Sequence, residues 1–211
     1  MFPKRLTDGY ASFLHGRLET ERARYLDLAE NGQHPSIMLI SCGDSRVAPE
    51  TIFDAGPGEM FVVRNIAGIV PPCEPTSQNA FHGTSACIEF GVNALEVSDI
   101  VVMGHASCGG VAAYVNQSPP LTRPDFIGKW MSQIAPVADK VGPQTGDRAD
   151  WIRRMEWGVV EYSLDNLLTF PAVHERVDAG TLRLHGAYFG VATGVLFIRD
   201  PHTGRFEPYQ E

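Results

Sequence analysis

Apolar residues along the chain fall into short continuous runs and helix-spaced stripes. Three runs have four consecutive apolar residues, which is typical of a parallel strand covered on both faces: 37–40, 60–63 and 100–103. Four other stretches space their apolar residues as a helix does: 85–95, 111–115, 126–134 and 151–170. Two later β-like runs, 182–189 and 195–198, predict a last core strand and an antiparallel edge.

This order of elements predicts the fold class. Strands that alternate with helices are typical of an α/β fold, so we expect a mostly parallel central β-sheet of about four strands plus an antiparallel edge strand, flanked by helices. Apolar residues near helical spacing up to Gly32 and Pro35 predict an N-terminal helical arm. With no internal repeat or linker in view, residues 1–211 are expected to form a single domain, with 1–34 as the arm and 35–211 as the α/β core.

Composition and charge narrow the class of protein. Of the 211 residues, 44% are hydrophobic and 20% are charged, as in ordinary globular proteins. The formal net charge is −8, and Lys and Arg form no cluster, so we expect no nucleic-acid partner. No apolar stretch approaches the roughly 20 residues of a membrane span, and the N-terminus does not resemble a secretory signal. We therefore expect a cytoplasmic protein with no membrane partner.

The four cysteines are too few and too scattered for a disulfide framework: Cys42, Cys73, Cys87 and Cys108. In a reducing compartment each is a metal ligand, a nucleophile or a packed core thiol. Cys87 lies on an apolar helix face, which favours packing, and Cys73 stands in a predicted loop.

Metal-ligand side chains follow two of the predicted parallel strands. Cys42 comes just after the run 37–40, and His105 and Cys108 come just after the run 100–103. Open α/β sheets bind ligands at the carboxyl ends of their strands. If these two strands are neighbours, two thiolates and an imidazole converge on one point. Such a set suits zinc, and three protein ligands leave the fourth position open, as in catalytic zinc sites.

Two charged residues add to this candidate site. Asp44 lies two residues beyond Cys42 and can point at the open position, while Arg46 can hold its carboxylate by a bidentate contact. That contact would lower the pKa of Asp44 and keep it an ionised acceptor beside the zinc-bound water. The alternative is a structural ion pair at a turn.

Two motifs resemble the signatures of the β-class carbonic anhydrases: Cys-x-Asp-x-Arg at 42–46 and His-x-x-Cys at 105–108. The likeness extends over most of the chain, through 32–35, 61–67, 70–72 and 83–86. It implies reversible hydration of carbon dioxide to bicarbonate and a proton by zinc-bound hydroxide, with one Zn²⁺ per subunit on Cys42, His105 and Cys108. It also implies a homodimer or higher homo-oligomer whose active-site cleft lies at the subunit boundary.

The resemblance further implies the residues that bind substrate. Gln33 matches a glutamine that reaches into the cleft from the neighbouring subunit. Phe61 and Ile66 match apolar positions of the carbon dioxide pocket, and Phe90 stands where plant-type members carry a tyrosine.

One departure from the family concerns regulation. A subgroup binds bicarbonate at a noncatalytic site of a tryptophan, an arginine and a tyrosine, and then closes with the aspartate on zinc. Arg64 is retained here, but Leu39 and Phe189 stand at the other two positions. Because these two side chains cannot donate hydrogen bonds to bicarbonate, we predict an open, water-bound zinc at neutral pH without this type of inhibition.

Other functions are weighed beside this one. Relatives hydrolyse carbon disulfide or carbonyl sulfide through the same zinc site. A cysteine hydrolase would use Cys108 and a histidine, and it would stay active without metal. A noncatalytic zinc or anion-binding module would leave Asp44 and Arg46 without a role. As a proton relay, His82 is the first histidine to test.

Overall fold

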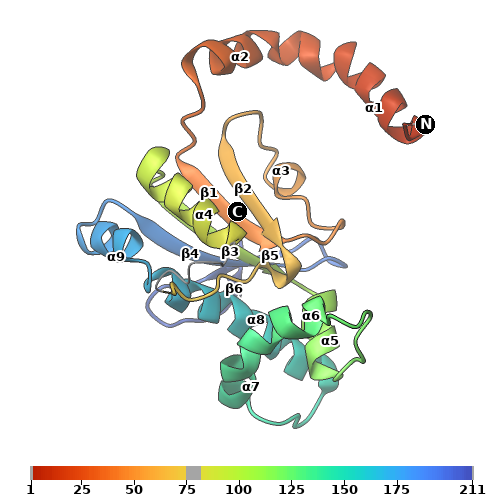
Figure 1. Ribbon diagram of the computed structural model, residues 1–211, viewed down its shortest axis with the longest axis vertical. Helices are drawn as coiled ribbons and strands as arrows, with labels where there is room; N and C mark the ends of the chain where they lie inside the picture. The colour runs from red at the N-terminus through yellow and green to blue at the C-terminus, as the bar shows by residue number, and fades with distance from the viewer. Residues whose placement is uncertain (1, 75–81, 211) are drawn as a thin grey trace.

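The computed structural model describes residues 2–74 and 82–210, and its centre is one six-stranded sheet in the order β2-β1-β3-β4-β5-β6 (Figure 1). The strands are β1 Ile37–Cys42, β2 Met60–Asn65, β3 Asp99–His105, β4 Arg183–Phe189, β5 Leu196–Arg199 and β6 Phe206–Pro208. The first four are mutually parallel, and β5 and β6 add to β4 in antiparallel fashion. The predicted fold class is confirmed, with two antiparallel edge strands in place of the single one expected.

The strand register places the carboxyl ends of β1 and β3 side by side. Ile37 pairs with Asp99 and Ser41 with Met103, so Cys42 and His105 leave the sheet at the same edge. Both strands are almost entirely buried, which explains why their sequences are continuously apolar rather than alternating. The expectation that the two strands are neighbours is therefore met.

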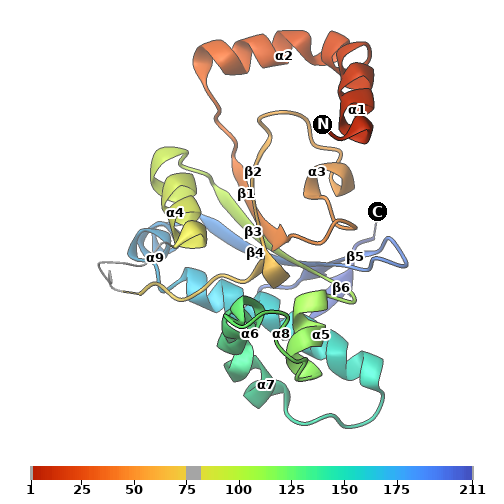
Figure 2. The same ribbon diagram turned by 45° about the vertical axis from the view of Figure 1, so that its right-hand side comes forward.

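Helices pack against the sheet (Figures 1 and 2). Their bounds are α3 Pro49–Ile52, η1 Ile66–Gly68, α4 Gly83–Glu89, η2 Phe90–Ala94, α5 Gly109–Val115, α6 Phe126–Met131, η3 Ser132–Ile134, α7 Ala135–Val141, α8 Arg148–Leu167 and α9 Pro171–Asp178. Helix α8 packs against β3 and β4, and its Val160 and Leu164 belong to the larger core cluster together with Met38 and Ile40 of β1. This long helix therefore supports β3, the strand that ends at His105.

Several predicted boundaries were wrong for local reasons. The helix expected at 85–95 begins at Gly83 and continues from Phe90 as a π-helix. The longest helix runs over 148–167 rather than 151–170, because Asp147 caps its N-terminus by accepting from the Asp150 amide. Pro171 opens the separate helix α9, where its missing N–H is harmless. The short elements α3, α7 and β6 were not predicted.

The N-terminal arm consists of two helices, α1 Lys4–Leu14 and α2 Arg17–Asn31, and not one. Gly16 stands at the break, where a poor helix former makes interruption easy. Neither helix contains a buried residue, and the arm stands away from the sheet (Figure 2). An ion pair between Arg24 and Glu59, 2.9 Å long, connects α2 to the loop before β2. Among the described residues, no helix has the length and apolar character needed to cross a membrane.

Candidate metal centre

Three metal-ligand side chains meet at the carboxyl edge of the sheet. Cys42 ends β1, His105 ends β3, and Cys108 stands immediately before α5. Their ligand atoms all lie within 4.8 Å of one another, and the two sulfur atoms are 4.0 Å apart. All three residues are buried. The structure therefore brings together the three residues that the two sequence motifs single out.

The orientation of His105 fits a metal ligand. Its Nδ1 lies 2.9 Å from the carbonyl oxygen of Ala106, a contact in which Nδ1–H donates and Nε2 is left as a bare acceptor. Nε2 is buried and has no hydrogen-bond partner among the residues that the structure describes. A buried nitrogen without a partner is costly unless a cation occupies the point at which it is aimed. Two sulfurs and this nitrogen form a donor set that zinc prefers.

The two thiols influence each other's protonation. The contact between the two sulfurs favours a single proton on the pair, because it lowers the pKa of Cys42 and raises the pKa of Cys108. A divalent cation at this point would replace that proton and neutralise both sulfurs.

Asp44 is held at the rim of the cluster by Arg46. The guanidinium donates from Nε to Oδ1 at 2.9 Å and from Nη2 to Oδ2 at 2.7 Å, and the Arg46 amide donates to Oδ1 at 3.0 Å. These hydrogen bonds hold the pKa of Asp44 well below its usual range. Oδ2 lies 3.9 Å from Nε2 of His105. The arrangement provides a permanently ionised acceptor next to the donor set.

Backbone groups near the sulfurs add contacts that the sequence does not reveal. The Ala67 amide donates to Sγ of Cys42 at 3.3 Å. Ala67 has a φ of 65° and Ser107 a φ of 58°, left-handed conformations that are uncommon for residues other than glycine. Gly68 follows Ala67 and approaches β1 so closely that a Cβ would lie 3.0 Å from the Ser41 carbonyl carbon. Local strain of this kind is found where a fold must aim particular groups.

Arg64 has a structural role at the same edge. It donates from Nε to the carbonyl oxygen of Cys42 at 3.0 Å and from Nη2 to those of Asp44 and Val47 at 2.6 and 3.2 Å. These contacts fix the turn that follows β1. A guanidinium so engaged has fewer donors left for an anion.

A cleft of about 540 Å³ opens next to the cluster. Its lining includes Cys42, Asp44 and Ile66 as well as the apolar side chains of Leu121 and Ile127. Ile66 is exposed, so its apolar side chain is accessible from the cleft. Apolar side chains and the ionised Asp44 therefore line the same cleft.

Three of the predicted substrate-binding residues lie elsewhere in the described part of the chain. Gln33 is exposed between α2 and β1. Phe61 pairs with Met38, four residues before Cys42 and therefore roughly 13 Å along the strand. It packs against Phe90, with ring centroids 5.7 Å apart. Within one chain these residues do not line the cleft, so their predicted role depends on a second subunit.

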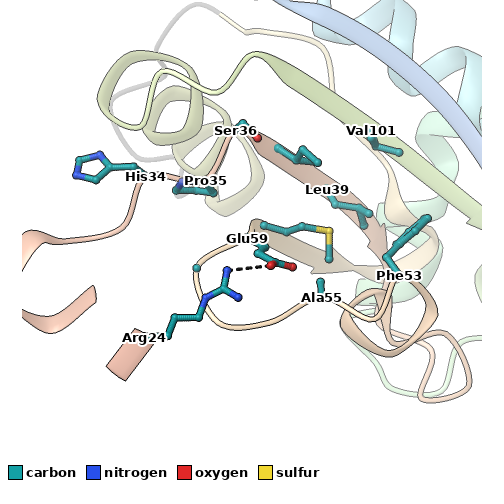
Figure 3. Close-up of a pocket in the computed structure, with 12 residues that line it drawn as sticks. Arg24, His34, Pro35, Ser36, Leu39, Phe53, Ala55, Glu59 and Val101 are labelled. Carbon is teal, nitrogen blue, oxygen red and sulfur yellow. Dashed lines mark hydrogen bonds and ion pairs between the residues drawn. The ribbon is translucent and has the colours of Figure 1, made fainter. Parts of the chain in front are cut away.

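A second cavity, of about 510 Å³, lies near the arm (Figure 3). Its lining is largely apolar, including Leu39, Phe53 and Val101, and its charged residues Arg24 and Glu59 are paired with each other. Leu39 is the residue expected to replace the tryptophan of a noncatalytic bicarbonate site. Leu39 and its apolar neighbours offer no hydrogen-bond donor to an anion, whereas His34 and Ser36 also line the cavity.

The other cysteines and His82 lie outside the metal-ligand cluster. Cys87 is partly buried against the larger core cluster, as expected of a packed thiol. Cys73 stands in a loop, as predicted, and is partly buried against the same cluster. His82 is exposed at the start of α4 and is outside both cavities described above. Glu156 was missed entirely, although it is buried and accepts a hydrogen bond from the Cys108 amide. Only its helical position among apolar neighbours could have drawn notice.

Comparison with known proteins identifies similar chains. Residues 37–196 match the protein family described as Carbonic anhydrase. Beta carbonic anhydrase 3 of Arabidopsis thaliana is 33% identical over 197 residues, which cover 90% of this chain and 74% of that protein. The structure of the beta-carbonic anhydrase CcaA superimposes with a TM-score of 0.89 at 30% identity, covering 99% of this chain and 92% of that one. A tetrameric beta-carbonic anhydrase of Sordaria macrospora gives a TM-score of 0.80 at 26% identity, covering 96% and 97%.

Proposed function

The chain belongs to the β-class carbonic anhydrases, and we propose that it interconverts carbon dioxide and bicarbonate at a zinc ion held by Cys42, His105 and Cys108. The observation that carries this proposal is the convergence of two sulfurs and an unpartnered imidazole nitrogen within 4.8 Å of one another. The donor set matches zinc, and the adjoining cleft gives a small molecule access to it. One zinc ion per subunit would satisfy these donors.

The residues around the donor set have separable roles in the proposed reaction. When bound, zinc would lower the pKa of a coordinated water toward about 7 and supply hydroxide at neutral pH. Asp44 would serve as a hydrogen-bond acceptor beside the metal position and would orient the nucleophile there. Arg46 keeps Asp44 ionised and holds both of its oxygens. Ile66 contributes an apolar wall against which uncharged carbon dioxide can rest.

We propose that the resting site is open, meaning that Asp44 does not bind the metal. Both oxygens of Asp44 are engaged by Arg46, so the carboxylate has a competing partner to any metal. Arg64 is occupied by backbone carbonyls, and Leu39 offers no donor. We therefore propose that bicarbonate does not drive Asp44 onto the metal.

We also propose that the complete substrate pocket requires a second copy of this chain. Gln33, Phe61 and Phe90 lie away from the cleft of their own subunit, and Phe90 is 45% exposed. A homodimer or larger homo-oligomer could bring them to the neighbouring cleft. The tetrameric assembly of the Sordaria macrospora relative supports this proposal. The assembly of this chain itself is measurable by analytical ultracentrifugation.

The structure also supports proposals for the domain organisation and the cellular location of the protein. We propose one domain over 1–211, with a core at 35–211 and an arm at 1–34, because one continuous sheet carries the core while the arm helices bury no residue. We propose a cytoplasmic location, since all four cysteines are free and thiols persist in a reducing compartment.

The test of function is stopped-flow hydration of carbon dioxide with protein of known zinc content. The same protein is measured as purified, after removal of metal with a chelator, and after zinc is restored. We expect rapid hydration that disappears with the metal and returns with it. Because Asp44 stays ionised far below neutrality, the rise of the rate with pH between about 6.5 and 9 reports on the coordinated water and not on Asp44.

Two results would redirect the assignment. Zinc-loaded protein that fails to hydrate carbon dioxide but hydrolyses carbon disulfide or carbonyl sulfide would favour the sulfur substrates. Activity that survives complete metal removal would favour a cysteine hydrolase using Cys108.

A further inference from the structure

Four backbone groups of the turn that carries the metal-ligand motif His105–Cys108 have a hydrogen-bond partner elsewhere in the fold or in the turn itself. The Ala106 amide donates to the Phe189 carbonyl oxygen at 2.9 Å. The Ala106 carbonyl oxygen lies against Nδ1 of His105 at 2.9 Å, and the Ser107 carbonyl oxygen accepts from Nη2 of Arg46 at 3.1 Å. These three contacts come from strand β4, from the ligand His105 itself and from Arg46, which also binds Asp44.

The remaining contact comes from the middle of helix α8. Oε1 of Glu156 accepts from the Cys108 amide at 2.9 Å, and Oε2 accepts from the Tyr188 hydroxyl at 2.6 Å. Glu156 is 4% exposed and Tyr188 is 3% exposed. A carboxylate is almost never buried to this degree unless it is paired. Neither residue lines the cleft, so neither is placed to touch substrate.

The positions of these two residues suit a supporting role. Tyr188 pairs with Gly104 in the sheet, next to the ligand His105. A Cβ on Gly104 would lie 2.8 Å from Val160 of α8, so the helix approaches β3 closely at this point. Glu156 therefore connects the rigid helix, the β4 strand and the Cys108 turn through two hydrogen bonds.

We propose that Glu156 is a positioning residue for the metal site, with Tyr188 as its anchor. Through the Cys108 amide, Glu156 sets the direction in which Cys108 presents its sulfur. The same turn receives Arg46 on the Ser107 carbonyl oxygen, so the position of the sulfur is linked to the Asp44–Arg46 pair. Outer partners of metal ligands typically contribute 10–100-fold to metal affinity or activity.

The test compares Glu156→Leu, Glu156→Gln and Tyr188→Phe with Asp165→Asn as the matched control. Asp165 lies on the same helix but is exposed, so its substitution also removes a carboxylate without touching the turn. In Glu156→Gln the side-chain oxygen can still accept from the Cys108 amide. Zinc affinity is measured by chelator competition, coordination geometry by the visible spectrum of the cobalt-substituted protein, and folding by thermal unfolding followed by circular dichroism.

We expect zinc affinity to fall about 10–100-fold in Glu156→Leu, less in Tyr188→Phe, and least in Glu156→Gln. The cobalt spectrum should shift in the same order, and kcat should fall with little change in KM because substrate contacts are intact. Asp165→Asn should behave as the unaltered protein. A purely structural role would lower thermal stability without moving the cobalt spectrum of the folded fraction.

The proposal is overturned if Tyr188→Phe and Glu156→Leu bind zinc and colour cobalt as Asp165→Asn does. If Glu156→Leu fails to fold, Glu156→Gln and Tyr188→Phe decide the matter by the same spectrum. This inference rests on the proposed metal site. Unaltered protein that binds no zinc removes both, whereas unaltered protein that binds zinc together with variants that bind it equally removes only the positioning role.

Discussion

At each end of the parallel strands, an aspartate forms a bidentate ion pair with an arginine. At the carboxyl end, Arg46 donates from Nε and Nη2 to Asp44 at 2.9 and 2.7 Å. At the amino end, Arg183 donates from Nε and Nη2 to Asp99 at 2.8 and 2.7 Å. Both aspartate side chains are 16% exposed, and both have a lowered pKa because of these hydrogen bonds.

The surroundings of the two pairs are different. At the amino end, Nε2 of His185 already lies 2.7 Å from Asp99, and Ser98 donates to the other oxygen at 2.7 Å. At the carboxyl end, Nε2 of His105 is 3.9 Å from Asp44 and is aimed at two buried sulfurs. An ion pair with a lowered pKa therefore does not mark a functional site by itself. What distinguishes the carboxyl end is the convergence of three buried metal-ligand atoms, one of which, Nε2 of His105, has no hydrogen-bond partner among the described residues.

The largest effect should come from the sulfur ligands. Cys108→Ser is expected to abolish zinc binding and to reduce carbon dioxide hydration to the uncatalysed rate, because an alcohol is a poor zinc ligand beside a thiolate. Zinc content by atomic absorption and stopped-flow hydration measure the two effects. Cys87→Ser, a thiol away from the cluster, is the control. Full zinc occupancy in Cys108→Ser would contradict the assignment of the carboxyl end.

Matched substitutions of the two aspartates test the comparison directly. Asp44→Asn should lower kcat by about 100-fold, the lower range for a lost acid–base group, because the amide cannot accept as a charged oxygen does. Asp99→Asn should leave kcat unchanged, since Asp99 lies at the other end of the strands. Stopped-flow hydration at saturating zinc separates the two. Equal losses in both variants would mean that the ion pairs act through stability alone.

Exchanging each arginine for lysine sharpens the same contrast. Arg46→Lys keeps the charge but loses the two-pronged contact and the bond to the Ser107 carbonyl oxygen, so we expect a loss of about tenfold in kcat. Arg183→Lys should have no effect on kcat. If Arg46→Lys is as active as the unaltered protein, the bidentate geometry at Asp44 has no part in the reaction.

The smallest effect is the pH dependence of stability at the amino end. The folded pKa of Asp99 lies below its unfolded value of about 3.9. Its contribution is therefore complete above that value and is lost as the pH falls through the folded pKa. Asp99→Asn should cost about 1 kcal/mol of unfolding free energy at neutral pH, a difference that shrinks toward pH 2. Urea unfolding over this range measures it, and a difference independent of pH would contradict the linkage.

The sequence by itself determined the parallel core and the identity of the candidate ligands. Continuous apolar runs predict strands buried on both faces, and the residues at 37–40 and 100–103 do lie in adjacent strands. Cys42, His105 and Cys108 follow those runs within a few residues, so their convergence depends only on strand order. Such features are local in sequence, and local patterns are readable from it.

Only the tertiary structure decided how the site is supported and completed. Glu156 reaches Cys108 across 48 positions of sequence, and a hydrogen bond of that kind leaves no periodic signal. The left-handed backbone at Ala67 and Ser107 is likewise imposed by packing and not by residue type. The same holds for Phe61, whose distance from the cleft of its own chain follows from strand register, and for Phe90, which packs against Phe61. The sequence specifies which chemical group stands at each position, whereas contacts between distant segments determine the direction in which that side chain points.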